Sequence, residues 1–249
     1  MAIAWMMVSD SQIQAIIRER ERDVKHQIMI SGCSLTAYWM GNYIADILNQ
    51  GLLSIIAIVS IHAFGLEIPK VEALFAVATL ANPPFVYFMS FIFKKEEAGS
   101  LFMKMIHFVM GLIAPIAFVV LQFINEKTKK IYNTLRWFCY PFPIFSLIFG
   151  YINISNRQIL MWINELEEEP DVFSKYVSGY SMIFLCCSIP FFWLQVVLFE
   201  NKVYSIDRCF RGKAKTNKVD AVVDVDILEE EKRVASKTPE ELKVRMDGF

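Results

Sequence analysis

Long hydrophobic stretches separated by short charged clusters dominate the chain. Four of them reach the roughly 20 mostly apolar residues needed to cross the hydrocarbon core of a bilayer, namely residues 38–64, 71–93, 101–124 and 180–199. Three of these stretches contain proline, and kinks are expected there: Pro83, Pro84, Pro115 and Pro190. The pattern therefore predicts four membrane-spanning helices.

Two further apolar stretches are too short to be ordinary spans. Residues 1–8 are expected to form the last part of a helix. Residues 137–152 carry no charge but contain Pro141 and Pro143 around Phe142. This favours a helical hairpin that enters the membrane and returns on the same side, and a fifth span is the alternative.

Residues 11–30 show the period of an amphipathic helix. Apolar side chains recur at spacings of four and seven at Ile13, Ile17, Val24 and Ile28, while arginine and glutamate fill the opposite face. We expect this helix to lie on the cytoplasmic leaflet and to end near Gly32.

Composition agrees with a membrane protein. Hydrophobic residues make up 55% of the 249 residues, compared with about 45–50% in soluble domains, so part of the surface is expected to face lipid. A net charge of −1 excludes a strongly basic protein that binds nucleic acid. The five cysteines lack metal-binding or redox spacing and are interpreted as packing residues.

The distribution of lysine and arginine predicts the orientation. With a hairpin that does not cross, twelve of them lie on one side, in residues 18–25, 94–95 and 202–218, and seven on the other. The richer side is expected to be cytoplasmic. Residues 1–200 are thus predicted to form an all-α polytopic membrane bundle, and residues 201–249 a short cytoplasmic tail that ends with the strand-like "LKVRM".

Polar side chains inside the first span need an explanation. Asn42, Asp46 and Asn49 share one face of a helix, and Asp46 lies about 12 Å along the axis from Tyr38. A carboxylate facing lipid there would cost roughly 2.5–3.5 kcal/mol. The three residues are therefore expected to face protein or water. They either line a translocation path or form hydrogen bonds between helices.

Three segments resemble the A subfamily of ABC transporters. The first is "ERDVKHQIMISGCSLTAYWMGNYIAD", which matches the family pattern at Glu21, Lys25, His26, Gln27, Ser31, Gly32, Tyr38, Trp39 and Asp46. The second is "PIFSLIFG", which matches at Pro143, Phe145, Leu147 and Gly150. The third is the tail, where "DVDILEEEKRV" and "LKVRMDGF" look like the linker and first strand of a nucleotide-binding domain. The segments stand in family order and cover most of the chain.

The resemblance implies the membrane part of an ATP-driven transporter of lipids or other amphiphiles. It makes two charged segments the contacts with a nucleotide-binding domain, which would bind ATP and magnesium: Arg20, Glu21, Lys25 and His26, and the turn at Lys94 and Lys95. The implied partners are membrane lipids, that domain and a second transporter half, in the same chain or another.

The 249 residues contain neither GxxxxGK[ST] nor the LSGGQ-type signature. No catalytic, cofactor-binding or metal-binding residue is therefore expected in this chain, which is interpreted as a fragment of a longer transporter or as a partner of other polypeptides. One alternative is a catalytically silent membrane scaffold or regulatory subunit. Another is a channel or secondary transporter, which only the polar stripe around Asp46 supports.

Two smaller features complete the prediction. Asn153 begins an N-glycosylation sequon on the expected outer side. Lys104 and His107 lie near the start of the third span. Snorkelling of Lys104 to the interface accounts for its charge there, and a proton relay is the alternative.

Overall fold

The computed structural model describes residues 2–66, 68–124, 126–163 and 168–211, and its regular elements there are helices. They are α1 (Ala2–Glu21), α2 (Val24–Ile30), α3 (Leu35–Ala63), α4 (Val71–Ser90), α5 (Glu96–Phe108), the π-helical turn η1 (Val109–Ile113), α6 (Ala114–Ile124), α7 (Glu126–Cys139), α8 (Pro143–Ser155), α9 (Arg157–Ile163) and α10 (Gly179–Arg211). Contacts divide the chain into residues 1–200 and 201–249. The predicted "LKVRM" strand lies outside the described residues.

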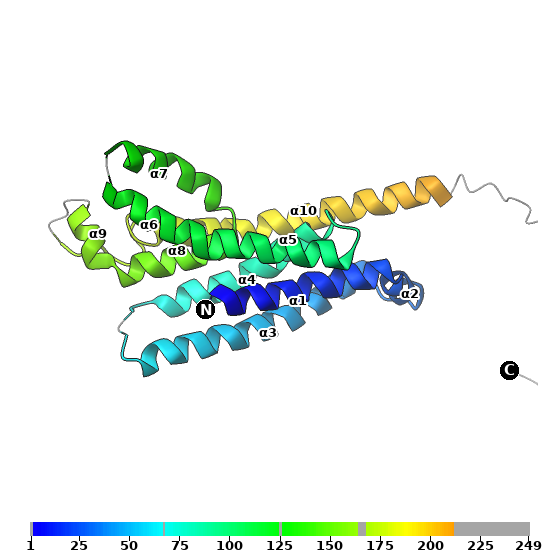
Figure 1. Cartoon of the computed structure of the whole chain (residues 1–249). Helices are drawn as coiled ribbons and strands as arrows, with labels where there is room; N and C mark the ends of the chain where they lie inside the picture. The colour runs from blue at the N-terminus through cyan, green and yellow to red at the C-terminus, as the bar shows by residue number, and fades with distance from the viewer. Residues whose placement is uncertain (1, 67, 125, 164–167, 212–249) are drawn as a thin grey trace, which may run out of the picture. The chain divides into compact units, whose positions relative to one another are not determined.

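The four predicted spans are confirmed. Among the described residues, four helical segments are long and apolar enough to cross a membrane: Leu35–Ala63, Val71–Ser90, Glu96–Gln122 and Gly179–Asn201. The third segment joins α5, η1 and α6, which Figure 1 shows as one run. Proline lacks the N–H of a regular helical turn, and the wider turn of η1 ends two residues before Pro115.

The N-terminal helix differs from the prediction. α1 continues through residue 11 without a break and ends before Asp23, whose φ of 55° is left-handed. Ile13 and Ile17 are fully buried and pack with Phe85 of α4 and Met103 of α5. The predicted interfacial helix over residues 11–30 is therefore wrong, because its apolar face contacts protein. The period of the pattern was right, but a period does not distinguish lipid from a neighbouring helix.

The second part of that stretch is α2, a helix of seven residues, none of which is completely enclosed. Gly32, with a φ of 98°, follows it in the left-handed conformation expected of a residue that ends a helix. Ser34 then accepts a hydrogen bond from the backbone N–H of Ala37, at 3.2 Å, and starts α3.

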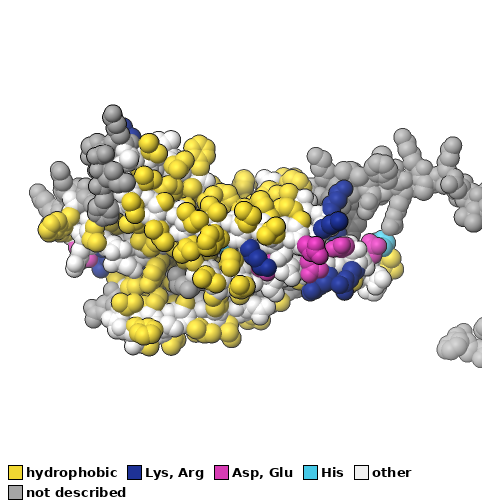
Figure 2. All heavy atoms as spheres, in the orientation of Figure 1, with side chains coloured by type: hydrophobic (Ala, Val, Ile, Leu, Met, Phe, Trp, Pro, Cys, Tyr) yellow, Lys and Arg dark blue, Asp and Glu magenta, His cyan; other side chains and the backbone are white. Residues whose placement is uncertain are grey.

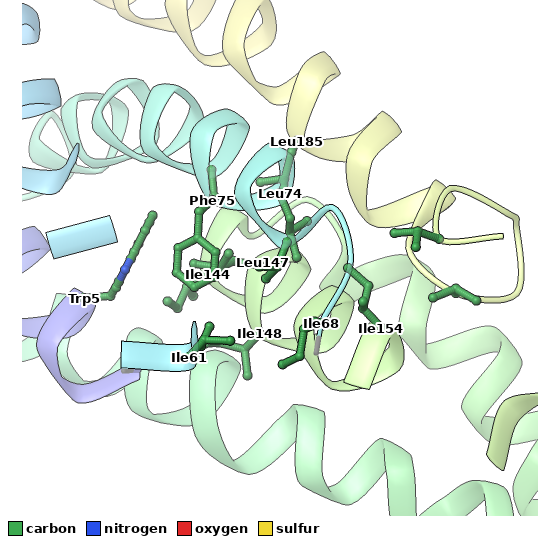
Figure 3. Close-up of a cluster of buried hydrophobic side chains, with 14 of the residues drawn as sticks. Trp5, Ile61, Ile68, Leu74, Phe75, Ile144, Leu147, Ile148, Ile154 and Leu185 are labelled. Atoms are coloured by element: carbon green, nitrogen blue, oxygen red, sulfur yellow. The ribbon is translucent and has the colours of Figure 1, made fainter. Parts of the chain in front are cut away.

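The core lies around α4, which is the most enclosed of the four spans. In an apolar stretch of 18 residues from each span, 67% of the residues of α4 are buried, compared with 17–22% in the other three. Figure 3 shows Leu74 and Phe75 of α4 packed among side chains from α1, α3, α8 and α10, including Trp5, Ile61, Leu147 and Leu185. Helices from both halves of the sequence thus share one hydrophobic core.

α7 and α8 form a helical hairpin with its turn at the predicted prolines, although its first arm begins earlier, and its entry into the membrane stays a prediction. α7 and α8 are joined at residues 140–142, and the rings of Tyr132 and Phe149, near the middle of each arm, are 6.3 Å apart. Phe118 of α6 packs against both rings. The first half of α7 is charged, so an apolar pattern found only its end. At 13 residues, α8 is too short for the alternative fifth span.

The surface of residues 1–200 is that of a membrane protein. Large hydrophobic side chains are exposed along α3, for example Leu48, Leu52 and Val59. Figure 2 shows hydrophobic side chains over the middle of the helices and charged side chains gathered near α2. With four spans, this surface places the protein in a membrane.

Candidate functional site

Charged residues of α1 hold the turn between α4 and α5. Arg20 donates hydrogen bonds from Nη2 to the backbone oxygens of Ser90 and Phe93, the second at 2.8 Å. A cation is favourable there, because the last carbonyls of a helix are unpaired and carry partial negative charge. Arg20 therefore fastens the end of α4 to the end of α1.

The next residue binds the other side of the turn. Glu21 Oε2 accepts a hydrogen bond from the backbone N–H of Glu96, at 3.3 Å, at the positive start of α5. Arg18 Nη1 lies 3.6 Å from the Glu96 carboxylate. The structure thus brings together the two charged segments that the sequence singled out. The turn itself presents Lys94 and Lys95, whose side chains are exposed.

A polar pocket of about 590 Å³ opens beside this turn. Its lining comes from α1, the first turns of α5 and the residues next to them: Gln14, Glu21, Arg22, Lys95, Glu96, Glu97 and Ser100.

A buried ion pair connects α2 with α10. Lys25 Nζ lies 2.7 Å from Glu200 Oε1, with side-chain exposures of 15% and 4%. The ammonium group also lies over the rings of Trp39 and Tyr38, 4.7 and 5.0 Å from their centroids. Burial lowers the pKa of Lys25, and Glu200 opposes this shift.

Sequence reasoning named Lys25 but missed Glu200. Glu200 is the first charge after 24 uncharged residues, and this position at the end of a span was a usable signal. Lys25 is the only charged member of α2 that turns inward, whereas His26 is exposed on the same helix. Val24, Gln27 and Ile30 of α2 are exposed as well.

The polar stripe of α3 differs by one residue from the prediction. Asp46 accepts a hydrogen bond from Tyr87 Oη at 2.5 Å, and Asn42 lies half-buried one turn earlier. Asn49 is exposed, and Gln50 occupies the buried position. A helix turns by about 100° per residue, so adjacent positions cannot both face the core. The buried row therefore continues from Asp46 to Gln50 and Ser54.

This row forms hydrogen bonds with α4, and Asn82 of α4 extends them to α1. Gln50 Oε1 accepts from Asn82 Nδ2 at 3.3 Å, and the same amide donates to Ser9 Oγ at 2.8 Å. Ser54 Oγ lies 2.8 Å from Thr79 Oγ1. Gln50 and Asn82 have no exposed surface. These contacts are those of hydrogen bonding between helices, and the lining of a path by Asp46 stays a prediction.

Lys104 has a partner that the sequence did not predict. Its Nζ lies 3.1 Å from Asp10 Oδ2 of α1. Gln14 Nε2 donates to the same oxygen at 2.9 Å and to Ser100 Oγ at 3.0 Å. The explanation of Lys104 by snorkelling alone is therefore incomplete, because a carboxylate from another helix balances its charge. His107 is buried, and its Nδ1 lies 3.1 Å from the Met103 carbonyl.

The sequon asparagine is 5% exposed. Asn153 Nδ2, the atom to which a glycan would be attached, donates a hydrogen bond to the Val177 carbonyl at 3.0 Å. Glycosylation of Asn153 stays a prediction, and this packing disfavours it once the protein has folded.

The fold and this charged end together define a polytopic membrane domain whose charged connecting segments are tied to its helices. Residues 1–198 match the model of the ABC-2 family of transporter proteins, so the chain belongs to this family. It is therefore the membrane component of an ABC transporter, and the resemblance found in its motifs is confirmed.

Curated relatives are A-subfamily transporters. "ATP-binding cassette sub-family A member 2" of Rattus norvegicus is 27% identical over 187 residues, which cover 72% of this chain and 8% of the relative. The mouse "Retinal-specific phospholipid-transporting ATPase ABCA4" is 24% identical over 245 residues, covering 94% of this chain and 10% of the relative. The human "Phospholipid-transporting ATPase ABCA7" is 26% identical over 165 residues, covering 63% and 8%. The chain thus spans only about a tenth of these relatives.

Proposed function

We propose that this membrane domain moves lipids or other amphiphiles across a membrane, driven by ATP that a separate nucleotide-binding domain hydrolyses with magnesium. The mouse and human relatives named above are phospholipid-transporting ATPases by name, and a membrane domain of the ABC-2 family is not itself catalytic. Residues 201–249 are proposed as the linker toward that domain.

The observation that carries the proposal is the arrangement of the charged end. Two surface elements, α2 and the turn between α4 and α5, project where a partner can reach them. α2 is tied to the span α10 through Lys25 and Glu200. The turn is tied to α1 through Glu21 and Arg20, and Arg20 also bonds the end of the span α4. A movement of the nucleotide-binding domain against His26, Lys94 or Lys95 would therefore displace the helices inside the membrane.

The experiment reverses the charges that hold the turn. Arg20→Glu with Glu21→Arg, in the transporter assembled with its nucleotide-binding domain, should lower the number of fluorescent phospholipids moved per ATP hydrolysed in proteoliposomes. Arg20→Glu removes the bonds to Ser90 and Phe93 and places a negative charge against their carbonyls. Lys175→Glu is the control, because Lys175 is an exposed cation in the loop before α10 and belongs to neither tie.

An unchanged ratio of transport to hydrolysis in the charge-reversed protein would contradict the role of this end. A scaffold or regulatory subunit is the second candidate. It predicts that the assembled protein moves no lipid with ATP in any variant.

A further inference from the structure

A charged pair interrupts the hydrophobic surface formed by α1 and α5. The Lys104 side chain is 41% exposed, whereas its partner Asp10 is only 9% exposed. Leu101, Met105 and Phe108 lie beside Lys104 along α5 and are exposed. Figure 2 shows a small charged patch within the hydrophobic area of this face. The ammonium group therefore points outward from a surface that otherwise suits acyl chains.

The depth of Lys104 requires a polar neighbour on its exposed side. It lies eight residues beyond Glu96, the first residue of the span, or about 12 Å along the helix axis. A charge surrounded by hydrocarbon at this depth is unfavourable. Asp10 occupies one of the three N–H donors of the ammonium group, so two remain for water or a ligand.

The pair is continuous with the polar pocket at the charged end. Gln14 bonds to Asp10 and Ser100, and both Gln14 and Ser100 also line the pocket of about 590 Å³. We call this row, from the pocket residue Glu97 through Ser100, Gln14 and Asp10 to Lys104, the α1–α5 polar track. It leads from the cytoplasmic end into the depth of the membrane.

We propose that the α1–α5 polar track binds the head group of a zwitterionic phospholipid from the cytoplasmic leaflet, an inference that rests on the proposed function. In such a lipid the phosphate lies nearer the bilayer centre than the ammonium group. The track has the complementary order, because Lys104 is deep and the exposed carboxylate Glu97 lies seven residues, or about 10.5 Å, nearer the cytoplasm. Leu101, Met105 and Phe108 would contact the acyl chains.

Native mass spectrometry of the purified full chain in detergent, with phosphatidylcholine as the probe, tests this site. Lys104→Gln should weaken retention of phosphatidylcholine about tenfold, because a charge-assisted hydrogen bond to phosphate is lost. Lys104→Arg should retain binding. Lys70→Gln is the matched control, since Lys70 is an exposed cation paired with Asp171 outside the track, and it should change nothing. Diacylglycerol, which lacks phosphate, should bind equally to wild type and Lys104→Gln.

A second variant examines the other end of the track without disturbing a buried group. Glu97→Gln changes an exposed side chain, so folding is expected to be unaffected. It should weaken phosphatidylcholine binding several-fold and leave phosphatidylglycerol, which has no ammonium group, unchanged. Equal loss for both lipids, or no loss for phosphatidylcholine, would overturn the assignment of a zwitterionic head group.

Competition distinguishes a lipid from a soluble phosphate compound. Phosphocholine or inorganic phosphate that displaced phosphatidylcholine at equal concentration would overturn the lipid assignment, and so would equal binding by the Lys104→Gln and Lys70→Gln variants. The assignment would also be overturned if the cysteine of the Lys104→Cys variant formed a cross-link to another transporter half and this contact excluded lipid. None of these measurements needs ATP, so a failure of ATP-driven transport would refute the proposed function separately.

Discussion

The buried pair between Lys25 and Glu200 provides the most direct test of how α2 is attached. At an effective dielectric constant of about 20, opposite charges 4 Å apart attract by about 4 kcal/mol, and the 2.7 Å contact here is closer. Desolvation of both groups offsets much of this attraction. Removing only one partner leaves a buried charge, which costs about 3–5 kcal/mol. Glu200→Gln keeps an oxygen acceptor for Lys25, so a loss of about 3 kcal/mol is expected.

A double-mutant cycle isolates the pair. Glu200→Leu, Lys25→Met and the double variant are compared by chemical denaturation in detergent, with tryptophan fluorescence as the signal. Trp39 is a suitable reporter because Lys25 lies over its ring. The double variant should be more stable than the sum of the single losses predicts, with an interaction of about 2 kcal/mol, because no unpaired charge is left behind. Losses below about 0.5 kcal/mol that simply add would refute the reasoning.

Three further predictions concern the described helices. Tyr87→Phe should destabilise the protein by about 1–3 kcal/mol in the same assay, because Asp46 loses its hydrogen bond, whereas Asn49→Leu on the exposed face should have little effect. Gly179→Ala should cost about 1–3 kcal/mol, since a Cβ there would lie 2.6 Å from the Phe173 carbonyl oxygen. Gly41→Ala is the control, because a Cβ added at Gly41 would have no neighbouring atom within 4 Å. This substitution should be neutral or stabilising. A hydrogen bond from Lys70 lowers the pKa of Asp171, so the contact is complete above the ordinary aspartate pKa and is lost as pH falls through the folded value. Asp171→Asn should therefore change the NMR chemical shifts around Lys70 at neutral pH and leave them unchanged in strong acid. A change of the same size at both pH values would contradict this.

The spans were predictable because a bilayer demands length and apolar composition, both of which are local properties. The direction in which each helix faces was less accessible. Ile13 and Ile17 show the same period whether they contact lipid or α4, and only the fold decides between them. Likewise, Asn49 and Gln50 are adjacent and equally polar, so the pattern could not tell which of them is buried.

Partners far apart in sequence were out of reach for a different reason. Glu200 lies 175 residues from Lys25, and Asp10 lies 94 residues from Lys104, so no local pattern joins them. The charged segments around Arg20 and Lys94 were found through their resemblance to a family. Their attachment to α4 through backbone carbonyls could not have been, because a backbone oxygen leaves no trace in residue identity.

The enclosed position of α4 has a consequence for the order of assembly during synthesis. The amide of Asn82 finds its acceptors on Ser9 and Gln50, and both precede it along the chain. When the ribosome delivers α4 to the membrane, these acceptors have already been made. The polar side chains of α4 can therefore form their hydrogen bonds with helices that are already present, which lowers the free-energy cost of placing this span in lipid. α8 and α10 pack against it afterwards.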